Sequence, residues 1–133
     1  MRTHRFLSLL LAALFASTLL PAIALAADGP AVLQVISVEV TGDRQAYLGK
    51  LATLQSITKR LGLPTARVWR STLAGPGTDT IYIATEYSSL AAMAEGQGKL
   101  NADGEASKLL RDIDASGMRT VLDRSLMVDD TPR

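Results

Sequence analysis

The chain has 133 residues, with 14 Lys and Arg against 13 Asp and Glu, no Cys and a single His. A formal net charge of +1 provides no basic surplus for binding nucleic acid or an anionic membrane by bulk charge. The absence of Cys excludes a disulfide framework, thiol chemistry and lipid attachment at an N-terminal Cys.

The N-terminus has the pattern of a cleavable secretion signal covering residues 1–26. Positive residues precede an apolar run from Phe6 to Leu20, and Ala24-Leu25-Ala26 forms a small-x-small cleavage pattern. This run of 15 residues is short of the roughly 20 that a membrane span needs. We therefore expect a precursor that is processed to residues 27–133, one domain that is periplasmic or secreted and has no stable membrane insertion.

Cleavage would also change the available chemistry. The single His is His4, so the processed chain would contain neither His nor Cys. The loss of Arg2 and Arg5 would shift the formal net charge from +1 to about −1. Most zinc sites, haem ligation by His or Cys, and an imidazole base are then excluded, and we expect no metal site and no cofactor.

The first two predicted elements are a strand and a helix. Residues 31–40 alternate so that Val32, Ile36, Val38 and Val40 share one face, with Gln34 as the polar exception, while Leu33, Val35, Ser37 and Glu39 share the other. Asp43 can cap a helix over residues 44–61, whose leucines and isoleucine recur every three or four residues. Gly62 and Pro64 predict its end.

A hairpin should follow. Residues 65–73 and 80–87 are strand-like and are separated by the turn-rich segment 74–79. A symmetric turn would place Arg67 opposite Glu86, Trp69 opposite Ala84 and Ser71 opposite Tyr82. All of these side chains would then share the face that carries Leu33 and Val35.

The rest of the chain predicts a second helical region and a last strand. The helical region starts near Leu90, is weakened by Gly96 and Gly98, breaks within 101–104 and resumes over 105–115. Residues 120–128 form the strand and 129–133 a polar tail. The order βαββαβ predicts an α+β, ferredoxin-like sandwich, in which a four-stranded antiparallel sheet carries two helical regions on one face.

The other face of that sheet needs a cover. Apolar residues lie on both faces of the first strand, and the chain has no spare segment to shield the second face. We therefore expect a homodimer in which two sheets pack face to face.

At this level of element order the chain resembles the dimeric α+β barrel superfamily, which includes antibiotic-biosynthesis monooxygenases, stress-responsive A/B-barrel proteins and NIPSNAP-like proteins. The resemblance is most specific over residues 67–76 (RVWRSTLAGP) and 82–90. It implies a small exported branch of this superfamily. It also implies that the sheet face away from the helices lines a ligand cavity.

The candidate pocket residues on that face are Glu39, Arg67, Trp69, Tyr82 and Glu86, with Ser37 beside them and Arg124 or Asp123 added according to the last strand's register. Arg67 would hold an anionic or carbonyl group, and the two aromatic side chains would stack on a flat ligand. The alternative is structural: an Arg67–Glu86 pair that helps to set the register, and Trp69 filling the dimer core.

Two functions remain open from the sequence. The first is a non-catalytic exported dimer that binds a small apolar or aromatic molecule or has only a structural role. The second, suggested by the resemblance, is a cofactor-independent monooxygenase or related small-molecule enzyme, in which the protein supplies orientation and desolvation.

Overall fold

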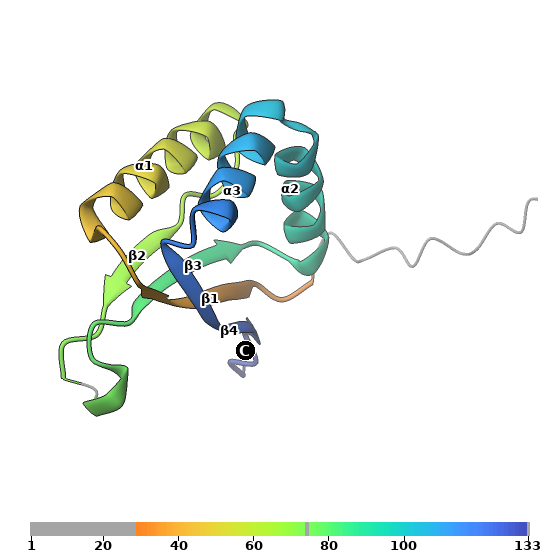
Figure 1. Ribbon diagram of the computed structural model, residues 1–133. Helices are drawn as coiled ribbons and strands as arrows, with labels where there is room; N and C mark the ends of the chain where they lie inside the picture. Colours follow the sequence, from red (N-terminus) through yellow and green to blue (C-terminus); the bar gives the residue numbers. More distant parts are fainter. Residues whose placement is uncertain (1–28, 74, 133) are drawn as a thin grey trace, which may run out of the picture.

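The computed structural model describes residues 29–73 and 75–132, so the predicted signal and its cleavage site lie outside the described residues. The strands are β1 (Val32–Val40), β2 (Arg67–Arg70), β3 (Ile81–Tyr87) and β4 (Arg119–Val128); the helices are α1 (Arg44–Arg60), α2 (Leu90–Ala102) and α3 (Gly104–Ser116). The strands form one antiparallel sheet in the order β2-β3-β1-β4, and the helices cover one face of it (Figure 1). The predicted ferredoxin-like α+β fold is confirmed.

Helix α1 begins and ends where the sequence predicts. The Asp43 carboxylate accepts hydrogen bonds from the backbone N–H groups of Gln45 (2.8 Å) and Ala46 (3.2 Å), which have no partner within the helix. At the other end Gly62 adopts a left-handed φ of 70°, and the Leu63 N–H donates to the Thr58 carbonyl at 2.9 Å. This stop turns the chain back toward the sheet.

The core lies between the helices and the two central strands. Its fully packed members are Val38, Tyr47, Leu51, Ile81 and Ile113. They come from β1, α1, β3 and α3, so one cluster joins both layers. Tyr47 is completely buried although it lies outside the leucine pattern that predicts the helix.

The second helical region divides at the predicted place, but its two glycines do not loosen it. Helix α2 runs without interruption through Gly96 and Gly98. A Cβ atom at Gly96 would lie 3.2 Å from the Tyr87 ring and 3.4 Å from Leu63, so glycine permits close packing of α2 on the sheet. Asp103 then ends α2 and caps α3, its carboxylate accepting from the Ala106 N–H at 2.9 Å.

Asp103→Ala is expected to lower the melting temperature at neutral pH, with the loss shrinking in acid. The hydrogen bond from the Ala106 backbone, aided by Arg60, holds the pKa of Asp103 below its usual value. Its stabilisation is therefore present above the ordinary aspartate pKa of about 3.9 and is lost as pH falls through the lowered folded-state value. Thermal unfolding measured from pH 7 to pH 3 checks this.

The matched control is Asp103→Asn, which keeps a capping oxygen but loses the charge; it should lose less stability than Asp103→Ala at pH 7 and lack the loss that the wild type shows in acid. An alanine variant whose deficit is the same at every pH would contradict the charged cap.

The hairpin register differs from the prediction by two residues. Arg67 lies opposite Ala84 and Trp69 opposite Tyr82, instead of Glu86 and Ala84. Ladder bonds continue to Ser71 and Thr80, and the chain between them makes a 3-10 turn at Gly75–Gly77. The Ser71 hydroxyl also donates to the Gly77 carbonyl. The connection between the two strands is therefore longer than the predicted symmetric turn. Strand β2 is correspondingly shorter than predicted.

The sheet has one covered face and one open face. The face toward the helices carries Val32, Ile36, Val38 and Val40, as predicted. The open face carries Leu33 and Val35 on β1, and on the flanking strands Trp69, 59% exposed, and Met127, 52% exposed. A register shift between Ser37 and Val38 in the β1–β4 pairing leaves Leu122 unpaired on β4. Among the described helices, none has the length and apolarity needed to cross a membrane.

Candidate functional site

All five residues predicted for the pocket lie on the open face of the sheet, but they do not form one site. Arg67, Trp69 and Glu86 line a shared hollow, whose other lining residues are Leu33, Thr65 and Ala84. Tyr82 lies directly across from Trp69, outside that lining. Glu39 is opposite Thr120 at the far end of β1 and is exposed.

The shifted register changes the chemistry of this hollow. Arg67 and Glu86 are diagonal neighbours instead of a directly opposed pair, and among the ion pairs of the described residues none joins them. Asp123 lies on the open face opposite Ser37, while Arg124 lies opposite Ile36 on the face toward the helices. The open face therefore presents separate charges of both signs among apolar side chains.

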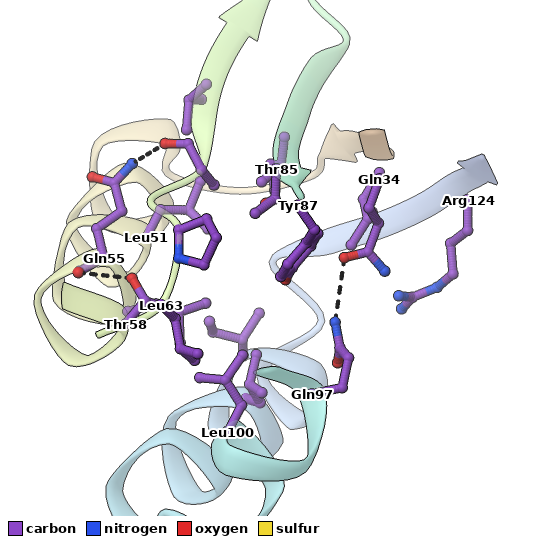
Figure 2. Close-up of a pocket in the computed structure, with 18 of the residues that line it drawn as sticks. Gln34, Leu51, Gln55, Thr58, Leu63, Thr85, Tyr87, Gln97, Leu100 and Arg124 are labelled. Carbon is purple, nitrogen blue, oxygen red and sulfur yellow. Dashed lines mark hydrogen bonds between the residues drawn. The ribbon is translucent and has the colours of Figure 1, made fainter. Parts of the chain in front are cut away.

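A second cavity lies between the helices and the sheet. The sequence predicts a pocket only on the other face of the sheet. Its volume is about 250 Å³, and Figure 2 shows its walls. The apolar lining comes from all three helices, three strands and the segment before β2: Ile36, Leu51, Leu54, Leu63, Pro64, Ala66, Val68, Ile83, Leu100, Leu110 and Ile113. Apolar walls with a few polar groups are typical of small-molecule sites.

The cavity exists because the chain before β2 leaves the sheet. Thr85 to Tyr87 on β3 pair with β1 but have no partner on β2, which starts at Arg67. The Gln55 side chain on α1 donates to the Ala66 carbonyl at 2.8 Å and so holds this segment under the helix. Leu63, Pro64 and Ala66 then form a wall instead of a strand.

Polar side chains gather at the opposite end of the cavity. Gln97 on α2 donates to the Gln34 side-chain oxygen on β1 at 3.3 Å, and Tyr87 on β3 lines the same cavity. Burial raises the pKa of Tyr87, while the Gln97 side chain opposes the rise. The phenol therefore stays neutral near pH 7 and can act there as a hydrogen-bonding group, but not as a base.

A charged group also borders the cavity beneath α3. The Arg119 side chain is 9% exposed and donates to Asp114 at 2.9 Å and to the Tyr47 hydroxyl at 3.3 Å. Burial lowers the pKa of Arg119, but the bonds to Asp114 and Tyr47 outweigh it, so its pKa is raised overall and it stays charged. Asp114, the one carboxylate among the described lining residues, is thus already paired.

A metal centre has no candidate among the described residues, since they contain no group of three or more His, Asp or Glu side chains placed to hold an ion. Two acidic residues of α3 form ion pairs with basic side chains: Asp112 with Lys108 at 2.5 Å, and Asp114 with Arg119.

The sequence contained a partial signal for this cavity. Gln34 is the one polar residue on the covered face of β1, and it is the residue that meets Gln97. Gln97 itself lies between two glycines, a pattern that suggested a loose helix. The outward course of residues 63–66 depends on a contact with α1, which has no local sequence signature.

Three solved structures have a fold similar to that of this chain. A NIPSNAP family protein from Agrobacterium tumefaciens superimposes with a TM-score of 0.58 at 15% identity, covering 78% of this chain and 90% of that one. A second NIPSNAP family protein from the same organism, described as of unknown function, gives 0.57 at 20% identity, covering 78% and 94%. A Shewanella oneidensis protein gives 0.50 at 14% identity, covering 74% and 88%.

The chain thus has an α+β fold similar to that of these two NIPSNAP family proteins. No protein-family model and no curated protein matches the sequence. At these identities the likeness concerns the fold alone, so function has to be argued from the cavity and the open face.

Proposed function

We propose that this protein is an exported, homodimeric binding protein for a small apolar or aromatic molecule, held in the cavity between the helices and the sheet. The observation that carries the proposal is a cavity of about 250 Å³ with mainly apolar walls, in which Gln34, Gln97 and Tyr87 offer polar groups to a ligand. An empty apolar cavity of about 150 Å³ can bind benzene, so this one can hold a ring with several further atoms.

Binding is favoured over catalysis by the state of the cavity's polar groups. Asp114 is paired with Arg119, and the raised pKa of Tyr87 keeps the phenol protonated. Neither group is available as a general base near neutral pH. The other polar residues of the lining are three glutamines, two threonines and two arginines, which can position a ligand by hydrogen bonding.

The dimer is proposed from the open face. Leu33, Val35, Trp69 and Met127 form an apolar surface that no element of the described chain covers. Arg67 on one side and Asp123 on the other give this face charges of both signs, so a second copy related by a twofold axis can match it. Trp69 and the hollow beside it would then lie in the dimer interface. This agrees with the alternative prediction that Trp69 fills the dimer core.

Export is proposed from the signal pattern of residues 1–26, with the processed chain in the periplasm or the medium. Fractionation of cells, followed by mass determination of the protein, tests this step. A processed mass outside the cytoplasm supports it, and an intact chain in the cytoplasm refutes it.

Thr85→Phe is expected to weaken binding of a neutral aromatic probe such as p-cresol by roughly ten- to a hundredfold. Thr85 lies on β3 and lines the cavity, so the larger ring would occupy the ligand's space (Figure 2). Each 1.4 kcal/mol of lost ligand contact is tenfold in affinity, so this range corresponds to a loss of about 1.4–2.8 kcal/mol. Ligand-observed NMR titration measures the change.

Thr85→Val is the matched control, because it nearly preserves the side chain's shape and should retain binding. The melting temperature of each variant separates a filled cavity from a disrupted fold. If p-cresol binds Thr85→Phe as well as it binds the wild type, the ligand site is not this cavity.

A further inference from the structure

One cationic side chain stands at the polar end of the cavity. Arg124 on β4 lines the cavity together with Gln34 and Gln97, and Figure 2 shows all three on one side of it, away from Gln55 and Thr58. Leu51 and Leu63 lie on the same side as Gln55 and Thr58, and Leu100 lies at the bottom of the view. Two arginines line the cavity: Arg119, which is paired with Asp114, and Arg124 at the end that carries Gln34 and Gln97.

Strand register keeps this group together. Arg124 is paired with Ile36, and Gln34 lies two residues from Ile36 on the same face of the neighbouring strand. Such diagonal neighbours have Cα atoms roughly 7–8 Å apart, within reach of two long side chains. The Gln97 bond then fixes the Gln34 oxygen, which leaves the Gln34 amide N–H₂ group to donate elsewhere.

Arg124, like Arg67 and Arg111, has no carboxylate partner among the described residues. Arg44, Arg60, Arg70 and Arg119 each pair with a carboxylate. Across the described ranges, Arg124 takes part in no ion pair or hydrogen bond, and its neighbour Asp123 points to the opposite face. An unpaired guanidinium beside an apolar cavity is complementary to a ligand with an apolar body and an anionic head.

We propose that the ligand class is a small apolar monocarboxylic acid, with its carboxylate at Arg124 and the Gln34 amide and its ring or short chain in the cavity. This inference rests on the proposed binding function. The volume of about 250 Å³ equals roughly eight water molecules at about 30 Å³ each, which suits one ring with a short side chain. Arg124 determines the preference for an acid, and the apolar walls supply the rest of the affinity.

The test compares 3-phenylpropionate with its neutral amide, 3-phenylpropanamide, by isothermal titration at low salt. The wild type should bind the acid roughly tenfold more tightly, equivalent to about 1.4 kcal/mol. Arg124→Gln should reduce the affinity for the acid to that for the amide and leave the amide unaffected. Added salt should weaken binding of the acid selectively.

Arg111→Gln is the matched control, since Arg111 is an exposed arginine on α3 outside the cavity lining, and it should change neither affinity. Equal binding of acid and amide by the wild type, unchanged in Arg124→Gln, overturns the inference and leaves the binding function standing. If neither probe binds the wild type at millimolar concentration, both proposals fail. Arg124 is exposed, so unchanged melting temperatures are expected to show that the variants fold.

Discussion

Replacing Ile81 with alanine is expected to lower the free energy of unfolding by about 2–5 kcal/mol, the usual range for an isoleucine in a packed core. The Ile81 side chain is 1% exposed and packs with Val38, its cross-strand partner, and with residues of α1 and α3. The loss combines the transfer of the removed carbons with the void they leave. Since small domains have about 5–15 kcal/mol in total, much of the stability would be lost.

Ile83→Ala is the matched control, because Ile83 lies two residues along the same strand and on the same face. Ile83 borders the cavity, so part of its surface already faces empty space and it has less packing to lose. Urea denaturation of both variants measures the difference. If Ile83→Ala costs as much as Ile81→Ala, the contrast between packed core and cavity is wrong.

Val35→Arg is expected to convert the proposed dimer into a folded monomer. Val35 lies in the middle of the open face, paired with Ala84 on β3 and Ser125 on β4. Burying an unpaired charge at an interface costs about 3–5 kcal/mol, and each 1.4 kcal/mol is tenfold, so dimerisation should weaken roughly a thousandfold. Sedimentation equilibrium of the chain without residues 1–26 measures the dissociation constant.

Ala52→Arg provides the control for this substitution. Ala52 is exposed on α1, in the layer on the other side of the sheet, so the same added charge should leave the dimer intact. Circular dichroism establishes that Val35→Arg is folded. A wild-type chain that is monomeric at high micromolar concentration would refute the dimer.

The open face and the cavity lie on opposite sides of one sheet. Dimerisation and ligand binding should therefore be affected by different substitutions. Val35→Arg should leave binding of 3-phenylpropionate unchanged, provided that each subunit holds its own ligand between its helices and its sheet. A joint loss of dimer and binding would instead place the ligand in the chamber between two sheets that the sequence predicts.

Local sequence patterns determined the elements and their faces. Alternation in β1 separates Val38 from Val35, the Asp43 cap and Gly62 bound α1, and the break near Asp103 divides α2 from α3. Each of these signals acts over a few residues, through side-chain periodicity or a single capping bond. From them the element order, and with it the ferredoxin-like fold, could be predicted.

Tertiary structure alone decided the hairpin register, the helix-side cavity and the position of Arg124. The register depends on how residues 71–80 fold back on themselves, and the cavity depends on Gln55 of α1 holding Ala66 away from β3. The face on which Arg124 lies depends on the shift in pairing at Ser37 and Val38. These outcomes depend on contacts between residues distant in the chain and on the choice between neighbouring strand registers. Neither the periodicity nor the composition of the sequence determines them.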